Sequence, residues 1–140
     1  MKRVLAAMAC VVLLLQGAAF AHEGEKHQGK HKEDARMDKM HKMMPEYARI
    51  QARITEALDK GDAAAVEAET GKILATIPDL KKAKPHKNLK ELATLRKIAS
   101  TFEEEVKATA ALAKRGDIAA AKAAFANVRK KCEECHAKFR

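Results

Sequence analysis

The sequence predicts an all-α protein, an antiparallel up-down-up-down four-helix bundle. Apolar residues recur at steps of three and four from residue 34 to the end of the chain, as in amphipathic helices, and no strand pattern interrupts them. A Gly-Asp pair breaks the period twice, at residues 61–62 and 116–117, 55 residues apart. Two similar helical hairpins, each burying a stripe that the other covers, form a four-helix bundle. A three-helix bundle with a loose first segment is the alternative.

Residues 1–21 have the layout of a secretory signal peptide: two basic residues, an apolar run over residues 4–15 and a small-x-small site that ends at Ala21. The run is too short to span a bilayer well. Cys10 lies within it, so we expect this cysteine to be removed with the peptide. The chain is therefore expected to be exported, most simply to the periplasm, with two cysteines left and no structural disulfide.

Residues 22–33 are polar and lack an apolar period, which is typical of a disordered arm. Three histidines in this arm, His22, His27 and His31, could bind copper or nickel, although their spacing suits no regular element. Loss of two basic residues with the signal peptide lowers the formal charge from +9 to +7. A basic, exported chain with 4% aromatic residues indicates an acidic protein partner and not nucleic acid.

The first two helices are predicted on either side of Gly61. Their inward positions are Met40, Met43, Tyr47, Ile50, Ile54 and Ala57 in the first helix, and Val66, Ile73 and Ile77 in the second. Gly61 ends the first helix and Asp62 caps the second. The second helix is expected to end near Ile77, because Pro78, Pro85 and the lysines between them predict a loop.

The third and fourth helices are predicted on either side of Gly116. Asn88 and Glu91 resemble a capping box at the start of the third helix. The inward positions are Leu92, Leu95, Ala99, Phe102, Val106 and Ala113 in the third helix, and Ile118, Ala121, Phe125, Val128, Cys132, Cys135 and Phe139 in the fourth. Both C-terminal cysteines therefore lie on the core face. We expect residues 34–140 to form one domain.

The end of the fourth helix carries Cys132-x-x-Cys135-His136, the spacing of a c-type haem attachment site. Two thiols three residues apart on a helix point the same way, so each can bond one vinyl group of a single porphyrin. The adjacent imidazole of His136 can then bind the iron as the proximal axial ligand. The motif predicts one covalent haem c inside the end of the bundle.

Two other sites use the same cysteine spacing. A zinc site needs a second pair of ligands, and no further cysteine follows the signal peptide. A thioredoxin-like redox pair occurs in a βαβ context, which this sequence lacks. Haem attachment is the preferred interpretation, and export agrees with it because c-type haem is attached outside the cytoplasm.

With these features the sequence resembles the class II c-type cytochromes, the cytochrome c-prime family and its low-spin relatives. The resemblance covers four helices, the C-terminal Cys132-x-x-Cys135-His136 and the closing Phe139-Arg140. It implies a single haem between the helices with a distal residue on the first helix. An apolar distal residue implies a five-coordinate iron that binds nitric oxide or carbon monoxide. A distal methionine implies a low-spin electron carrier.

Equal rise along antiparallel first and fourth helices places His136 opposite residue 41, give or take a turn. Met40 is the expected distal ligand by the family's first-helix pattern, with Met43 and Met44 as alternates and His41 and His86 in reserve. Flexible core packing is the other role open to these methionines. Pro45 predicts a kink in the first helix or a hinged segment before it, which leaves an open distal site possible.

The leading functional interpretation is a periplasmic electron-transfer carrier, with the gas-binding relative second and a His-rich metal-binding helical protein third. No acid–base or nucleophile constellation occurs outside the haem motif, so we do not expect an enzyme. We expect a monomer or homodimer that does not span the membrane. The lysines predicted to surround the haem end, and to attract an acidic redox partner, are Lys39, Lys42, Lys81, Lys82, Lys84, Lys87, Lys130, Lys131 and Lys138, together with Arg140.

Overall fold

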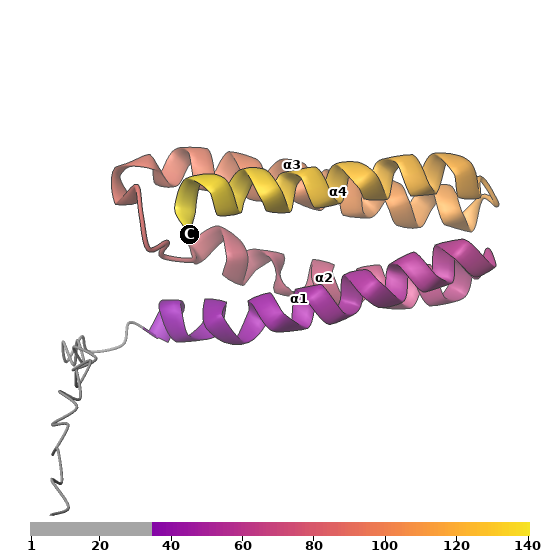
Figure 1. Cartoon of the computed structure of the whole chain (residues 1–140), viewed down its shortest axis with the longest axis horizontal. Helices are drawn as coiled ribbons and strands as arrows, with labels where there is room; N and C mark the ends of the chain where they lie inside the picture. Colours follow the sequence, from indigo (N-terminus) through magenta and orange to yellow (C-terminus); the bar gives the residue numbers. More distant parts are fainter. Residues whose placement is uncertain (1–34) are drawn as a thin grey trace, which may run out of the picture.

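The computed structural model describes residues 35–140, which form four α-helices and one short 3-10 helix (Figure 1). The helices are α1 (Ala35–Lys60), α2 (Ala63–Lys82), η1 (Leu89–Glu91), α3 (Leu92–Lys114) and α4 (Ile118–Phe139). Within these residues there is no strand, which confirms the all-α four-helix bundle. The predicted signal peptide and His-rich arm lie outside the described residues. No helix among those described is long and apolar enough to cross a membrane.

The two Gly-Asp turns form as predicted. Gly61 and Gly116 adopt positive φ angles of 68° and 78°, which glycine reaches without steric strain. At the first turn, the amides of Gly61 and Asp62 donate to the carbonyls of Leu58 and Ala57 and so close a Schellman motif. Asp62 and Asp117 then cap the following helices, each accepting a hydrogen bond from a backbone amide three residues on at 3.0 Å. These turns reverse the chain at one end of the bundle.

The predicted stripes meet in a common core. Its fully buried members include Ile54, Leu58, Val66, Ile73, Val106 and Val128. Buried polar groups there are satisfied within the helices: Thr70 and Thr109 donate to the carbonyls of Val66 and Glu105. Met40, Leu92 and Ile118, three of the predicted inward residues, are only half-buried.

Two sequence expectations for the chain between the hairpins are wrong. Helix α2 does not stop at Ile77 but continues through Pro78 to Lys82. Proline removes a single helix hydrogen bond, and the apolar stripe goes on beyond it, because Leu80 is buried. Asn88 and Glu91 form no capping box. Asn88 has a left-handed backbone (φ 56°), and its side-chain amide donates to the carbonyl of Lys138 instead.

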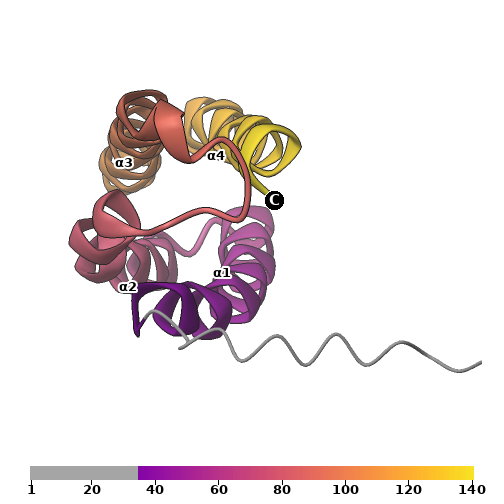
Figure 2. The same ribbon diagram turned by 90° about the vertical axis from the view of Figure 1, so that its left-hand side faces the viewer.

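Pro45 lies inside α1, which is helical on both sides of it. Seen end-on, the first turns of α1 bend toward α2 (Figure 2). Proline is a common cause of such bends. An ion pair between Lys39 and Asp79, with 2.7 Å between its atoms, connects the two helices in this region.

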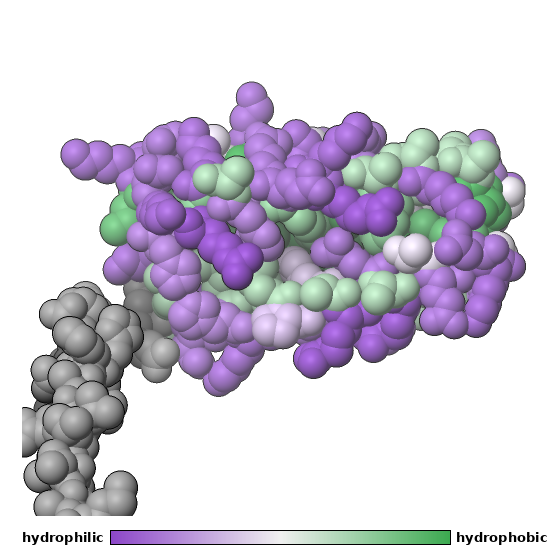
Figure 3. Space-filling view, in the orientation of Figure 1, coloured by the Kyte–Doolittle hydropathy of each residue, from purple (hydrophilic) through white to green (hydrophobic). Residues whose placement is uncertain are grey.

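The end of the bundle opposite the Gly-Asp turns holds the C-terminus. Towards this end α1 diverges from α4, and the loop between α2 and η1 crosses the end of the bundle (Figures 1 and 2). Apolar side chains lie between hydrophilic ones on the face between α1 and α4 (Figure 3). The cysteine motif is on this part of α4.

Candidate functional site

The Cys-x-x-Cys-His motif occupies the last turns of α4. Cys132 and Cys135 are half-buried free thiols on the inward face, and His136 is exposed. Cys132 packs against the main core, whereas Cys135 packs against a smaller cluster formed by Leu95, Ile98 and Phe139. The structure thus brings the three motif residues to the boundary between the core and the opening beside α1.

Two contacts define the register of α4 against α1. Lys122 pairs with Asp59 at 2.8 Å, and the Gln51 amide nitrogen lies 3.7 Å from the Cys132 sulfur. Extending this antiparallel pairing by one turn beyond Cys132 places His136 opposite residues 45–47 of α1. The neighbour of His136 is therefore about four to six residues further along α1 than residue 41, which equal rise from the turn predicts.

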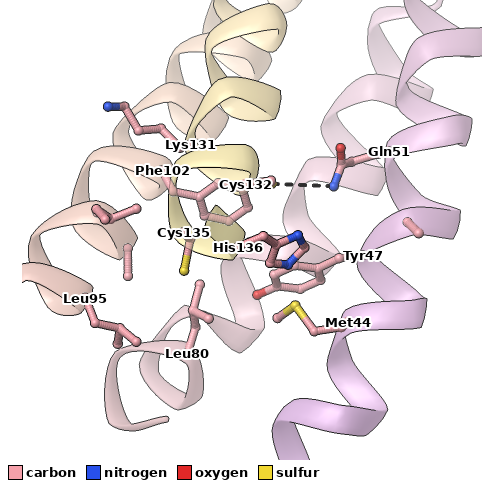
Figure 4. Close-up of a pocket in the computed structure, with 13 residues that line it drawn as sticks. Met44, Tyr47, Gln51, Leu80, Leu95, Phe102, Lys131, Cys132, Cys135 and His136 are labelled. Atoms are coloured by element: carbon pink, nitrogen blue, oxygen red, sulfur yellow. Dashed lines mark hydrogen bonds between the residues drawn. The ribbon is translucent and has the colours of Figure 1, made fainter. Parts of the chain in front are cut away.

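Two adjoining cavities run along the motif, one of about 110 Å³ and one of about 660 Å³. Six residues line both: Met44, Ala48, Leu80, Leu95, Cys135 and His136. The smaller cavity reaches Cys132 and the aromatic side chains of Tyr47 and Phe102 (Figure 4). Together they form a continuous, mainly apolar groove with both thiols and the imidazole on the α4 side, which suits a flat apolar macrocycle attached through sulfur.

The three methionines of α1 that the sequence names as candidate ligands lie in three different environments. Met44 lines both cavities together with His136, and Met40 lines only the larger one. Met43 is 8% exposed and belongs to the core, lining a different pocket with Thr76 and Asp79. Met44 is therefore the methionine that the structure places closest to the motif in register, and Met43 packs away from it.

His41 and His86 meet across the larger cavity. Their Nε2 atoms are 3.1 Å apart and their ring centroids 5.1 Å apart, in a contact between α1 and the α2–α3 loop. Each ring thus uses against the other its Nε2, one of the two ring nitrogens with which a histidine can bind a metal. Among residues 35–140, no group of three or more His, Cys, Asp or Glu side chains is arranged to hold a metal ion.

Burial keeps both thiols protonated. It is the main cause that raises the pKa of Cys132 to about 11, with further contributions from the neighbouring Cys135 and Glu133 charges. The pKa of Cys135 is raised by burial and by the Glu134 carboxylate. A reactive redox thiol needs a lowered pKa, so the surroundings of this pair do not suit thiol–disulfide chemistry.

Tyr47 and Gln51 line the groove, but the sequence did not identify them as site residues. Burial raises the pKa of Tyr47 to about 12, and its hydroxyl forms a 2.7 Å hydrogen bond with Thr76. The Tyr47 ring packs against that of Phe102 with 5.8 Å between centroids. Periodicity placed Tyr47 on the inward stripe. It could not identify the residue that faces Cys132, because that depends on how α1 and α4 pair.

Most of the lysines predicted at this end are neutralised by acids from neighbouring positions or elements. The pairs are Lys39 with Asp79, Lys42 with Asp38, Lys81 with Glu103, Lys131 with Glu134, and Lys138 with Glu91. The predicted residues that form no ion pair with a described residue are Lys82, Lys87, Lys130 and Arg140. Beside Lys87 lies Leu89, the one exposed large apolar side chain of the described residues, at 50%. The basic surface is smaller than the sequence predicts.

Comparison with known proteins supports the resemblance. Residues 79–140 match the family model described as cytochrome C′. The match includes η1, α3, α4 and the entire motif, and it supports the class II c-type cytochrome family. No curated protein and no solved structure matches the chain.

Proposed function

Because the chain is a member of the class II c-type cytochrome family through residues 79–140, we propose that it is an exported monohaem electron carrier. One haem would be attached through Cys132 and Cys135, with His136 as the proximal iron ligand. The observation that carries the proposal is the shared placement of two thiols and an imidazole along one wall of an apolar groove. The bound haem would supply a one-electron Fe(III)/Fe(II) couple.

The groove supports haem attachment better than the two competing uses of the thiols. The raised pKa of Cys132 opposes a redox dithiol, and the described residues provide no further ligands for a zinc site. A neutral thiol is the form that adds across a vinyl group, so a raised pKa is compatible with thioether formation. Leu80, Leu95 and Phe102 would contact the macrocycle and exclude water from it.

For the sixth ligand we propose a methionine of α1, and the register favours Met44 over Met40. Met44 lines both parts of the groove with His136, and a thioether ligand raises the reduction potential as suits a carrier. His41 and His86 are weaker candidates, because binding iron through Nε2 would break the contact between the two rings.

A five-coordinate, gas-binding cytochrome is the second candidate function. The observation that favours it is Pro45, which lies inside α1 and lines the larger cavity with Met44, because a bend there can hold the methionine away from the iron. A His-rich metal-binding protein is a third, and it depends on the arm at residues 22–33, outside the described residues.

We propose that the redox partner is an acidic protein that approaches the haem end. Lys87 and Lys130 are among the basic residues there without an ion pair to a described residue, together with Lys82 and Arg140, and exposed Leu89 adds an apolar contact. Such charges act mainly on the rate of association, and salt screens them beyond about 10 Å at about 0.1 M. Attachment of c-type haem outside the cytoplasm and the predicted signal peptide support a periplasmic location.

Mass spectrometry of protein from a host that matures c-type cytochromes tests the attachment. The expected mass is that of the processed chain plus one haem, and the Cys132→Ala, Cys135→Ala double variant should lack the addition. An absorption spectrum in both oxidation states then separates the two cytochrome functions. A low-spin spectrum supports the carrier, whereas a high-spin spectrum in both states supports gas binding. Bare wild-type protein from a competent host contradicts both.

A further inference from the structure

The loop between α2 and η1 is hydrogen-bonded to the last turn of α4, two residues beyond the proposed proximal ligand. The Asn88 side-chain amide donates to the carbonyl of Lys138 at 2.7 Å, and the Lys87 amide donates to the carbonyl of Phe139 at 3.4 Å. The last carbonyls of a helix have no partner within it. Here two of them receive donors from a segment 50 residues away in the sequence.

The backbone at Asn88 is specialised for this contact. Its φ of 56° and ψ of 40° lie in the left-handed region, where asparagine is better tolerated than most residues. Its side chain does not cap η1. The Asn88 side chain points away from η1, and its amide donates a hydrogen bond to α4 instead. Glu91 adds an ion pair with Lys138, but both side chains are well exposed, so this pair contributes little.

Apolar packing holds α4 against α3 independently of the Asn88 hydrogen bond. Phe139 is 4% exposed and packs with Leu95 and Ile98 of α3, alongside Cys135. Loss of the Asn88 contact should therefore leave α4 folded and docked. What it should change is the freedom of the exposed last turn, which carries His136.

We propose that Asn88 is a positioning residue for His136. By holding the carbonyl of Lys138, its amide restricts the last turn of α4 to one arrangement, so the His136 imidazole keeps a single orientation toward the groove. The inference rests on the proposed haem ligation by His136. It adds a residue outside the Cys-x-x-Cys-His motif, on a different element, to the set that determines the iron–imidazole bond.

Three variants of the mature haem protein test the inference. Asn88→Asp retains the size of the side chain but places a carboxylate oxygen against the Lys138 carbonyl. Asn88→Gly adopts the left-handed backbone without strain, so it removes the hydrogen bond alone. The control is Asn127→Asp, the same substitution on α4 at a residue whose amide lies 3.5 Å from Glu105, away from the last turn.

Two measurements are made on each variant. Amide hydrogen exchange over residues 136–140 should be about 2- to 10-fold faster in both Asn88 variants, the range that corresponds to one neutral hydrogen bond. The iron–histidine stretching band, recorded by resonance Raman spectroscopy on the ferrous protein in a Met44→Ala background, where the proposed sixth ligand is absent, should broaden or split. Asn127→Asp should match wild type in both measurements.

Each other outcome overturns the inference. Faster exchange with an unchanged iron–histidine band means that Asn88 stabilises the last turn of α4 but does not orient His136. An effect in Asn88→Asp but not in Asn88→Gly means that the added charge is responsible and not the lost bond. If wild-type protein carries no haem, both the proposed function and the positioning role are wrong. If haem is attached but both Asn88 variants behave as wild type, only the positioning role fails.

Discussion

Gln51 of α1 faces Cys132 of α4 across the groove, with its amide nitrogen 3.7 Å from the sulfur. This contact joins residues 81 positions apart and establishes which part of α1 lies opposite the haem motif. The hydrogen bond from Gln51 lowers the pKa of Cys132, but burial has the larger effect and raises that pKa. The register that follows from this pair leads to the first prediction.

Met40, Met43 and Met44 of α1 should respond differently to substitution by alanine. Met44→Ala should convert the haem protein to a high-spin form that binds carbon monoxide readily, because it removes the proposed sixth ligand. Met40→Ala should leave a low-spin spectrum. Met43→Ala should also remain low-spin but lose about 2–5 kcal/mol of unfolding free energy, because Met43 is a core residue. Absorption spectra and urea unfolding measure these effects.

Two results would reassign the ligand. A high-spin Met40→Ala with a low-spin Met44→Ala would restore the ligand that the sequence pattern favours. If all three variants stay low-spin, His86→Ala and His41→Ala become the decisive variants, since these residues line the same cavity.

The Cys132 thiol should react slowly in the chain without haem. In a Cys135→Ala background, alkylation by iodoacetamide should rise with pH at values above the ordinary thiol pKa near 9, because burial, the main cause of the raised Cys132 pKa, remains in this variant. The neutral thiol is the favoured folded form, so its contribution to stability is complete below the unfolded pKa near 9 and is lost as pH rises through about 11. The pH midpoint for alkylation of the same variant unfolded in urea is the reference for the midpoint of the folded chain. A folded-state midpoint at or below the urea value would contradict the burial argument.

Charge reversal at the haem end should reduce electron transfer to an acidic partner. Lys87→Glu and Lys130→Glu should each lower the second-order rate at low ionic strength and flatten its dependence on salt. Arg115→Glu is the matched control, an equal reversal at the opposite end of the bundle beside the second Gly-Asp turn. Stopped-flow kinetics over a range of salt concentrations provide the measurement. If all three variants slow equally, net charge and not a docking surface is responsible.

Two glycine substitutions should shift stability in opposite directions. Gly61→Ala should destabilise the bundle by about 1–2 kcal/mol, because alanine is strained at a φ of 68° even though the space around the site is open. Gly71→Ala should stabilise it by about 0.5–1 kcal/mol, because Gly71 lies in helix α2, where nothing stands within 4 Å of an added Cβ. Thermal unfolding measures both. Shifts of the same sign would contradict the conformational argument.

Much of the fold follows from local patterns in the sequence. The four helices, the two Gly-Asp turns and the inward stripes depend on interactions between residues a few positions apart, so periodicity and capping residues predict them. Two local patterns gave wrong predictions, in each case because a contact with a distant residue competed with the local interaction. Asn88 resembles a helix cap, yet its amide bonds to Lys138. Pro78 resembles a helix stop, yet burial of Leu80 favours continuation of the helix by five residues, to Lys82.

The sequence by itself determined the class of site, because the Cys-x-x-Cys-His spacing is local and its chemistry needs three neighbouring side chains. Only the tertiary structure decided which residues face that motif. The register of α1 against α4 depends on contacts such as Asp59–Lys122 and Gln51–Cys132, between segments far apart in the chain. A shift of one or two turns leaves the periodic pattern of either helix almost unchanged, but it exchanges Met40 for Met44 opposite His136.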